Sequence, residues 1–183
     1  MSQLHQFKES ELAHQYLDGL KGIEIGGSWW NPFGLDVVYS DLNPMGYHEE
    51  KHGKSLPIEI VCAGDDIPVP DKSFDFVINS HVLEHFYDPI RALLEWKRIA
   101  RKYIFLIIPH KERIFDRDRI CTSVNELILR HKEDVKEYED RHWNVWTPSK
   151  FMELMDYMGF NVVEMQERDD KVGNGFTVII KLS

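Results

Sequence analysis

The chain has 183 residues, of which 43% are hydrophobic and 12% aromatic. This length predicts a single domain over residues 1–183, and the apolar content is sufficient to fill its core, which excludes a disordered chain. The 22 basic residues are outnumbered by 31 acidic ones, so the formal net charge is −9. A negative field of this size repels phosphate backbones, so we expect no nucleic-acid partner.

Charged side chains interrupt the first twelve residues, which therefore do not resemble a signal peptide. The longest strongly apolar stretch, Tyr103–Pro109, reaches about a third of the ~20 residues that a membrane-spanning helix needs. Cys62 and Cys121 are too few for a disulfide scaffold or a thiolate zinc site. These features predict a cytoplasmic protein with no membrane partner, and they leave the oligomeric state open.

Five short apolar runs predict β-strands, because each is bounded by Gly, Pro, Asp or Asn. The fifth run has no polar alternation, which is typical of a strand that helices cover on both faces of a parallel sheet. The five runs are Gly22–Gly26, Asp36–Leu42, Ile58–Ala63, Phe74–Asn79 and Tyr103–Pro109.

Helical patterns separate these strands. The clearest is Pro148–Met158, where Thr147 is the N-cap candidate and Gly159 follows the last apolar position. A second helix begins at Asp88-Pro89 and carries basic residues near its C-terminal end. Further helices are expected over about Leu4–Asp18 and about Ser123–His131.

The C-terminal tail predicts an antiparallel hairpin of Phe160–Gln166 and Phe176–Leu182 around a Gly-Asn-Gly turn. The fold class is therefore α/β, a Rossmann-like doubly wound sheet of seven strands, mostly parallel with a C-terminal antiparallel hairpin. Ligands bind such sheets beyond the carboxyl ends of the strands. Residues that follow each strand are therefore the candidate site residues.

Acidic residues and glycines stand at these strand ends. Glu24 precedes Gly26 and Gly27, which allow a sharp turn and a close approach of the backbone to a ligand. Asp41 ends the second strand, where a carboxylate is placed to accept both hydroxyls of a ribose. Asp65 follows the third strand and could accept a hydrogen bond from an exocyclic amine.

The segments Asp71–Val77, Val82–His85 and Asp88-Pro89, together with the strand-end residues, resemble class I S-adenosylmethionine-dependent methyltransferases over about Lys21–Pro109. The resemblance implies S-adenosylmethionine as cofactor. It implies that the glycine turn holds the methionine part, that Asp41 binds the ribose and that Asp65 meets the adenine. The complete set of predicted cofactor contacts is Glu24, Gly26, Gly27, Ser28, Asp41, Leu42, Asp65, Ser80 and His81.

A rival motif covers the end of the fourth strand. His81-Val82-Leu83-Glu84-His85 matches H-x-x-E-H, in which two imidazoles on one helix face hold zinc and the glutamate acts as general base. The segment follows a strand directly, and Pro89 leaves barely two helical turns. We therefore predict no metal site.

Residues 110–146 are an insertion on the substrate side of the sheet, so we expect substrate selection there. A methyl acceptor usually loses a proton, and histidine accepts protons near neutral pH. The candidate catalytic residues are His85, His110 and His142. The charged run 132–141 is expected to be a solvated helix face or linker.

The predicted function is S-adenosylmethionine-dependent methyl transfer to a small-molecule acceptor, such as a sugar or another metabolite intermediate. Three alternatives stay open. The chain could be a methyltransferase-fold binding module without turnover, a zinc-dependent hydrolase acting through residues 81–85, or a nicotinamide oxidoreductase. The last of these lacks its glycine fingerprint.

Overall fold

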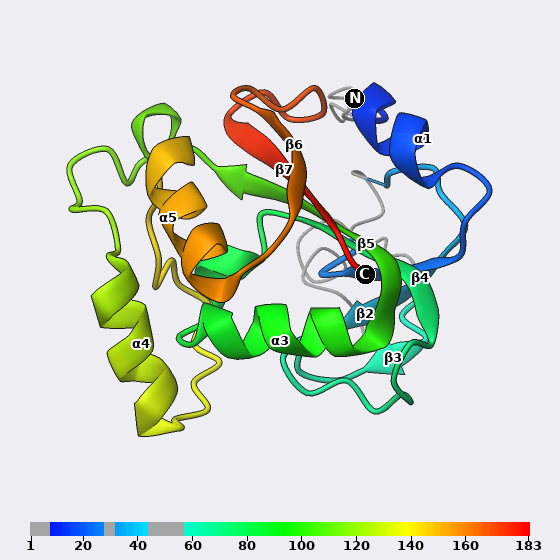
Figure 1. The fold of residues 1–183 in the computed structure, drawn as a ribbon, viewed down its shortest axis with the longest axis horizontal. Helices are drawn as coiled ribbons and strands as arrows, with labels where there is room; N and C mark the ends of the chain where they lie inside the picture. The colour runs from blue at the N-terminus through cyan, green and yellow to red at the C-terminus, as the bar shows by residue number, and fades with distance from the viewer. Residues whose placement is uncertain (1–7, 28–31, 44–56) are drawn as a thin grey trace, which may run out of the picture.

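In the computed structural model of the chain, the structure describes residues 8–27, 32–43 and 57–183, which form one seven-stranded sheet with flanking helices (Figure 1). The strand order is β3-β2-β1-β4-β5-β7-β6. Every pair is parallel except those that β7 makes with β5 and β6. The predicted fold class is therefore confirmed. The strands are β1 (Gly22–Ile25), β2 (Val37–Asp41), β3 (Ile60–Val61), β4 (Phe74–Ser80), β5 (Ala100–Pro109), β6 (Val162–Gln166) and β7 (Gly175–Lys181).

Side-chain caps define where the helices begin. Ser10, Asp88, Ser123 and Thr147 each accept a hydrogen bond from a backbone N–H in the first helical turn. The helices they precede are α1 (Glu11–Leu17), α3 (Pro89–Ile99), α4 (Val124–Glu133) and α5 (Pro148–Met158), and short 3₁₀ turns form η1 (Leu83–His85) and η2 (Lys111–Arg113). Among the residues that the structure describes, no helix is long and apolar enough to cross a bilayer.

The two faces of the sheet bury separate hydrophobic cores. Ile104 and Leu106 of β5 point to the face that α3, α4 and α5 cover, whereas Phe105 and Ile107 point to the face that α1 covers. This alternation follows from the two-residue period of a strand. In Figure 1, α4 and α5 accordingly lie on the opposite side of the molecule from α1. The unbroken apolar run of β5 thus has the two-sided burial that its sequence predicts.

Two expected elements are shorter than their sequence patterns suggest. The third strand retains only Ile60 and Val61, because β3 lies at the edge of the sheet. Just before it, the Tyr39 N–H donates to the Glu59 carboxylate at 2.7 Å and not to a backbone carbonyl of the neighbouring strand. The N-terminal helix begins at Glu11 within the described residues, where the Ser10 cap sets its start. Its expected first residues, before Lys8, lie outside the described part of the chain.

Every residue of the charged run 132–141 is exposed, as expected of a solvated helix face or linker, but the run also contacts the edge of the sheet. Helix α4 ends at Asp134, whose backbone is left-handed at φ 53°. The chain then crosses the carboxyl ends of the strands, where Lys136 pairs with Asp66 at 2.8 Å and Asp140 lies 3.2 Å from His85. The composition of the run alone does not reveal this path across the strand ends, along which the exposed Lys136–Asp66 pair and the Asp140–His85 contact lie.

Candidate active site

A cavity of about 660 Å³ opens beyond the carboxyl ends of β1, β2 and β4, where the doubly wound topology predicts the ligand site. Strand ends supply one wall, and segments 138–140 and 172–174 supply the other. The lining residues that the sequence predicted are Glu24, Gly26, Asp41, Leu42, Ser80, His81 and His85; those that it missed are Ile25, Asn43, Cys62, Ala63, Gly64, Val82, Phe86, Tyr138, Glu139, Asp140, Val172 and Asn174.

The turn after β1 requires glycine at both predicted positions. Gly26 has a left-handed backbone at φ +68°, and a Cβ there would lie 2.7 Å from Val82 Cγ2. A Cβ on Gly27 would lie 2.6 Å from the Tyr39 ring. Gly26 lines the cavity and Gly27 does not. The third predicted residue of the turn, Ser28, lies outside the described residues.

Glu24 brings a buried carboxylate to the cavity. Its side chain is 4% exposed, and its Oε2 atom has no hydrogen-bond partner among the described residues. Burial raises the pKa of Glu24 to about 8, against an opposing effect of the Lys171 ammonium. Burial likewise lowers the pKa of Lys171 to about 8. Glu24 is therefore an acceptor whose charge is poorly compensated in the ligand-free protein.

Asp41 ends β2 and lines the same cavity. Its Oδ1 atom accepts the Asn43 N–H at 2.9 Å, which fixes one carboxylate oxygen and leaves the other for a ligand. Burial raises the pKa of Asp41, and backbone hydrogen bonds from Asn43 and Leu42 oppose that rise. Leu42 adds an apolar side chain that is 52% exposed at the mouth of the cavity.

The predicted adenine contact, Asp65, lies behind the cavity wall rather than in it. Tyr138, which does line the cavity, donates its hydroxyl to Asp65 Oδ1 at 3.4 Å. The preceding residue, Gly64, forms the wall instead, and its carbonyl accepts the indole N–H of Trp96 at 2.8 Å. The segment after β3 thus contributes the backbone of Gly64 to the cavity wall, and the side chain of Asp65 positions Tyr138.

The loop between β6 and β7 closes the cavity on the side of β1. Asp169, 3% exposed, accepts backbone N–H bonds from four residues of this loop: Lys171, Val172, Gly173 and Gly175. The carboxylate thereby sets the loop conformation that presents Val172 and Asn174 to the cavity. The Gly-Asn-Gly turn was the sequence signal for this loop, although it did not predict a site.

Beyond β4 the chain turns toward a second cavity of about 510 Å³. His81 has a left-handed backbone at φ +58°, and burial lowers the pKa of its imidazole to about 4, so the ring is neutral. His85 lines both cavities, whereas His142 lines only the second. The remaining residues around the second cavity are Phe115, Arg119, Asp140 and Arg141.

The helix on which the H-x-x-E-H motif depends does not form. His81 has a left-handed backbone, and only a single 3₁₀ turn, Leu83–His85, follows it. Glu84 is fully buried and cannot present a general base to a substrate. The arrangement therefore does not support zinc-dependent hydrolysis through residues 81–85.

His110 stands apart from the other two candidate catalytic residues. It follows β5, but it lines neither cavity. Its Nδ1 accepts the Glu112 N–H at 3.2 Å, and its ring packs edge-on against Phe176 with centroids 6.3 Å apart. The structure brings His85 and His142 together and leaves His110 as the cap of a 3₁₀ turn.

The first cavity fits a nucleoside that carries an amino-acid group. It combines a buried carboxylate with one unpaired oxygen at Glu24, a second carboxylate at Asp41 and apolar walls from Ile25, Val82 and Phe86. Carboxylates accept hydrogen bonds from ammonium and ribose hydroxyl groups, and apolar walls suit a purine ring.

Comparison with known proteins supports this interpretation. Residues 23–108 match a family model described as "Methyltransferase domain". The uncharacterized protein MJ1123 of Methanocaldococcus jannaschii is 27% identical over 159 residues, which cover 85% of this chain and 72% of that protein. The match confirms the resemblance to class I methyltransferases that the sequence predicts.

Solved structures share the fold. One is a methyltransferase of Thermotoga maritima, described as SAM-dependent, with 22% identity and a TM-score of 0.58 over 92% of this chain and 84% of that one. Another is a chain from the complex between the Haloferax volcanii methyltransferase activator Trm112 and a methyltransferase. It is 13% identical, with a TM-score of 0.64, over 93% of this chain and 87% of that one. At these identities the similarity establishes the fold.

Proposed function

We propose that this chain, whose residues 23–108 match a family model of methyltransferase domains, transfers a methyl group from S-adenosylmethionine to a small-molecule acceptor. When bound, S-adenosylmethionine supplies an electrophilic methyl group on a sulfonium sulfur. The methyltransferase domain bears out the predicted cofactor. The identity of the acceptor and the roles of individual residues are our proposals.

The observation that carries the proposal is the position of two carboxylates around one cavity. Glu24, with its unpaired Oε2, would accept the ammonium group of the methionine part. Asp41, with one oxygen already fixed by Asn43, would accept the ribose hydroxyls. Gly64 and Tyr138 would flank the adenine, because they form the wall in front of Asp65.

The acceptor would occupy the second cavity. His85 separates the two cavities, and its imidazole meets that of His142 edge to face, with ring centroids 4.8 Å apart. We propose that these two histidines contact the acceptor. Phe115 packs over His142 with centroids 4.8 Å apart, and Arg119 and Arg141 stand at the rim. Both guanidinium groups are already paired with carboxylates, Arg119 with Asp116 and Arg141 with Glu139, so the cavity suits a small polar acceptor.

A methyltransferase-fold module that binds the cofactor without turnover is the second candidate. In the class I methyltransferases that the sequence resembles, the turn that holds the cofactor usually has a third glycine. Ser28 stands in its place, and this departure favours the module. Methyl transfer from labelled S-adenosylmethionine to a small-metabolite pool separates the two. Product formation supports the enzyme, and cofactor binding without product supports the module.

Replacing Asp41 with alanine is expected to weaken the binding of S-adenosylhomocysteine at least tenfold, because two hydrogen bonds to a charged acceptor would be lost. Isothermal titration calorimetry measures this loss directly. The matched control is Asp36→Ala, which removes an exposed carboxylate just before the other end of β2.

The control should bind S-adenosylhomocysteine with wild-type affinity. Wild-type protein that fails to bind at millimolar concentration would overturn the proposed function. Equal affinity of the Asp41→Ala variant and the wild type would overturn the ribose-binding role alone.

A further inference from the structure

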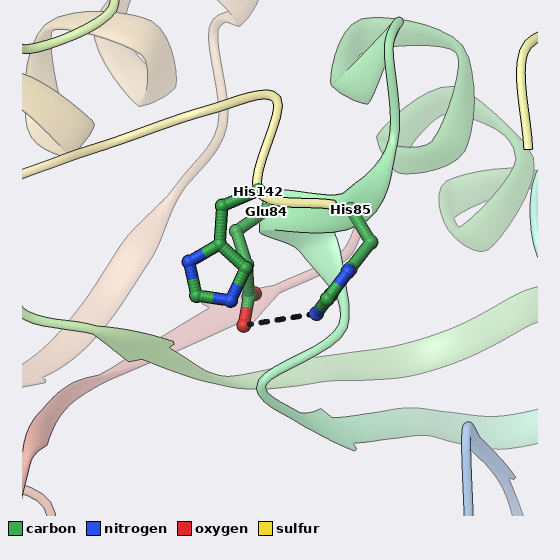
Figure 2. Close-up of side chains that lie close together, drawn as sticks. All are labelled: Glu84, His85 and His142. Carbon is green, nitrogen blue, oxygen red and sulfur yellow. Dashed lines mark ion pairs between the residues drawn. The ribbon is translucent and has the colours of Figure 1, made fainter. Parts of the chain in front are cut away.

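Glu84, His85 and His142 form a cluster of potential metal ligands between the two cavities. One ligand atom from each lies within 4.8 Å of the others. His85 Nε2 is 3.8 Å from Glu84 Oε1. Figure 2 shows both imidazole rings beside the Glu84 carboxylate, one from η1 and one from the chain that follows α4. Residues far apart in the sequence therefore converge on one point.

The Glu84 carboxylate lacks the partners that a buried charge requires. Its side chain is 0% exposed, and neither oxygen has a hydrogen-bond partner among the described residues. Its ion-pair neighbours in the described part of the chain are imidazoles, His81 at 3.9 Å and His85 at 3.8 Å. An ionised carboxylate that is buried without compensation is strongly unfavourable, and a bound cation would supply the compensating charge.

Two further carboxylates lie beside the imidazoles, and one of them makes a hydrogen bond. Asp116 Oδ2 lies 2.6 Å from His142 Nδ1, and Asp140 Oδ1 lies 3.2 Å from His85 Nδ1. A carboxylate that accepts the Nδ1 proton leaves the lone pair on Nε2, which is how proteins prepare histidines to bind metals. Asp116 is 1% exposed and is itself held by Arg119 at 2.7 Å. The His142 ring is thus held with Nε2 available, whereas His85 Nδ1 has no hydrogen-bond partner among the described residues and is only near Asp140.

The backbone holds the cluster together independently of these side chains. The N–H groups of Trp143 and Asn144 donate to the Glu84 carbonyl at 2.9 and 3.1 Å. The Asn144 side chain donates to the Phe86 carbonyl at 2.5 Å. The segment that carries His142 is therefore docked on η1, and the three ligand atoms stay close without a bound ion.

We propose that Glu84, His85 and His142 bind one divalent first-row transition-metal ion. Two imidazole nitrogens and one carboxylate oxygen are a donor set for Zn²⁺, Mn²⁺ or Fe²⁺, and three protein ligands leave at least one position open. Two ligands of one ion at about 2.1 Å lie roughly 3.4 Å apart in tetrahedral geometry. The 3.8 Å between His85 Nε2 and Glu84 Oε1 is longer than this value, and the three ligand atoms lie within 4.8 Å of one another, so a bound ion would draw them together.

The proposed site differs from the one that the H-x-x-E-H pattern predicts. Glu84 is a ligand here and not a base, and His142 takes the place of His81. The proposal also departs from the prediction, made from the sequence, that the chain has no metal site. Since His85 and His142 line the second cavity, the open position would face the acceptor and could bind one of its oxygen or nitrogen atoms.

The test is zinc binding to the full chain after chelator treatment. By competition with a chromophoric chelator, wild-type protein should bind one Zn²⁺ that the His142→Ala and His85→Ala variants bind at least tenfold more weakly. The matched control is His14→Ala, which removes a histidine of α1 that lines neither cavity and should keep wild-type affinity. Substitution with Co²⁺ should give a d–d absorption band that both cluster variants lose.

Circular dichroism establishes whether each variant is folded. If an alanine variant is unfolded, Glu84→Gln carries the test, because it keeps the shape of the side chain and removes its charge. Wild-type protein without stoichiometric Zn²⁺ at micromolar concentration, or undiminished affinity in all folded cluster variants, would overturn the inference. Ion binding is measured without methyl donor, so failure here leaves the proposed function intact when S-adenosylhomocysteine still binds.

Discussion

Replacing Trp96 with alanine is expected to lower the free energy of unfolding by about 4 kcal/mol, the cost of truncating a fully buried aromatic side chain. Trp96 is 0% exposed in α3, and its ring meets that of Phe86 edge to face with centroids 5.8 Å apart. Its indole N–H also donates to the Gly64 carbonyl at 2.8 Å. Urea denaturation followed by circular dichroism measures the change.

Two control variants separate packing from the hydrogen bond. Trp96→Phe keeps an aromatic ring and leaves the Gly64 carbonyl without its donor, so we expect a loss of about 1–3 kcal/mol. Leu94→Ala, on the same helix at 45% exposure, should cost less than about 1 kcal/mol. Because Gly64 lines the cavity, Trp96→Phe should also weaken S-adenosylhomocysteine binding. Equal losses in Trp96→Ala and Leu94→Ala would contradict this account of the core.

The sequence predicts best those elements whose stability depends on local or periodic features. Helix α5 has the predicted bounds, because Thr147 and Gly159 cap it and its apolar positions have helical spacing. The run at β5 is buried on both faces as its composition predicts. In contrast, the third strand is shorter than predicted and contains only Ile60 and Val61. As an edge strand it forms backbone hydrogen bonds with one neighbouring strand alone, and its own sequence does not set how many.

The same distinction applies to the candidate site. Glu24 and Asp41 could be predicted because a topological rule places strand ends at the ligand site. No comparable rule predicts that His142 lies near Glu84, 58 residues earlier in the chain. That proximity depends on two backbone hydrogen bonds, which the residues after His142 donate to the Glu84 carbonyl. Tyr138 lines the first cavity because segment 132–141 crosses the strand ends in the folded protein. The sequence of this segment has no helical or strand periodicity that would predict its position.

The stability of the ligand-free protein is expected to pass through a minimum near pH 8, and Glu24→Gln should make the acidic side of that minimum shallower. Part of that side remains in the variant, because burial also raises the pKa of Glu84 to about 8. The pKa of Glu24 rises from 4.5 to about 8 on folding, so the native state binds more protons than the unfolded state between these values, and the free energy of unfolding falls as pH rises. The pKa of Lys171 falls from 10.5 to about 8, so above pH 8 the native state binds fewer protons and stability recovers.

Urea denaturation from pH 5 to pH 9 measures this profile. Between pH 5 and pH 8 the wild type should lose roughly 3 kcal/mol more than Glu24→Gln, since each unit of pKa shift corresponds to about 1.4 kcal/mol and solvation relaxes part of it. Glu11→Gln, which removes an exposed carboxylate from α1, should keep the wild-type profile. Parallel wild-type and Glu24→Gln profiles would show that Glu24 is ionised throughout. A ligand ammonium that pairs with Glu24 should favour its ionised form. Saturating S-adenosylhomocysteine should therefore make the wild-type profile less steep below pH 8 and leave the shape of the Glu24→Gln profile unchanged.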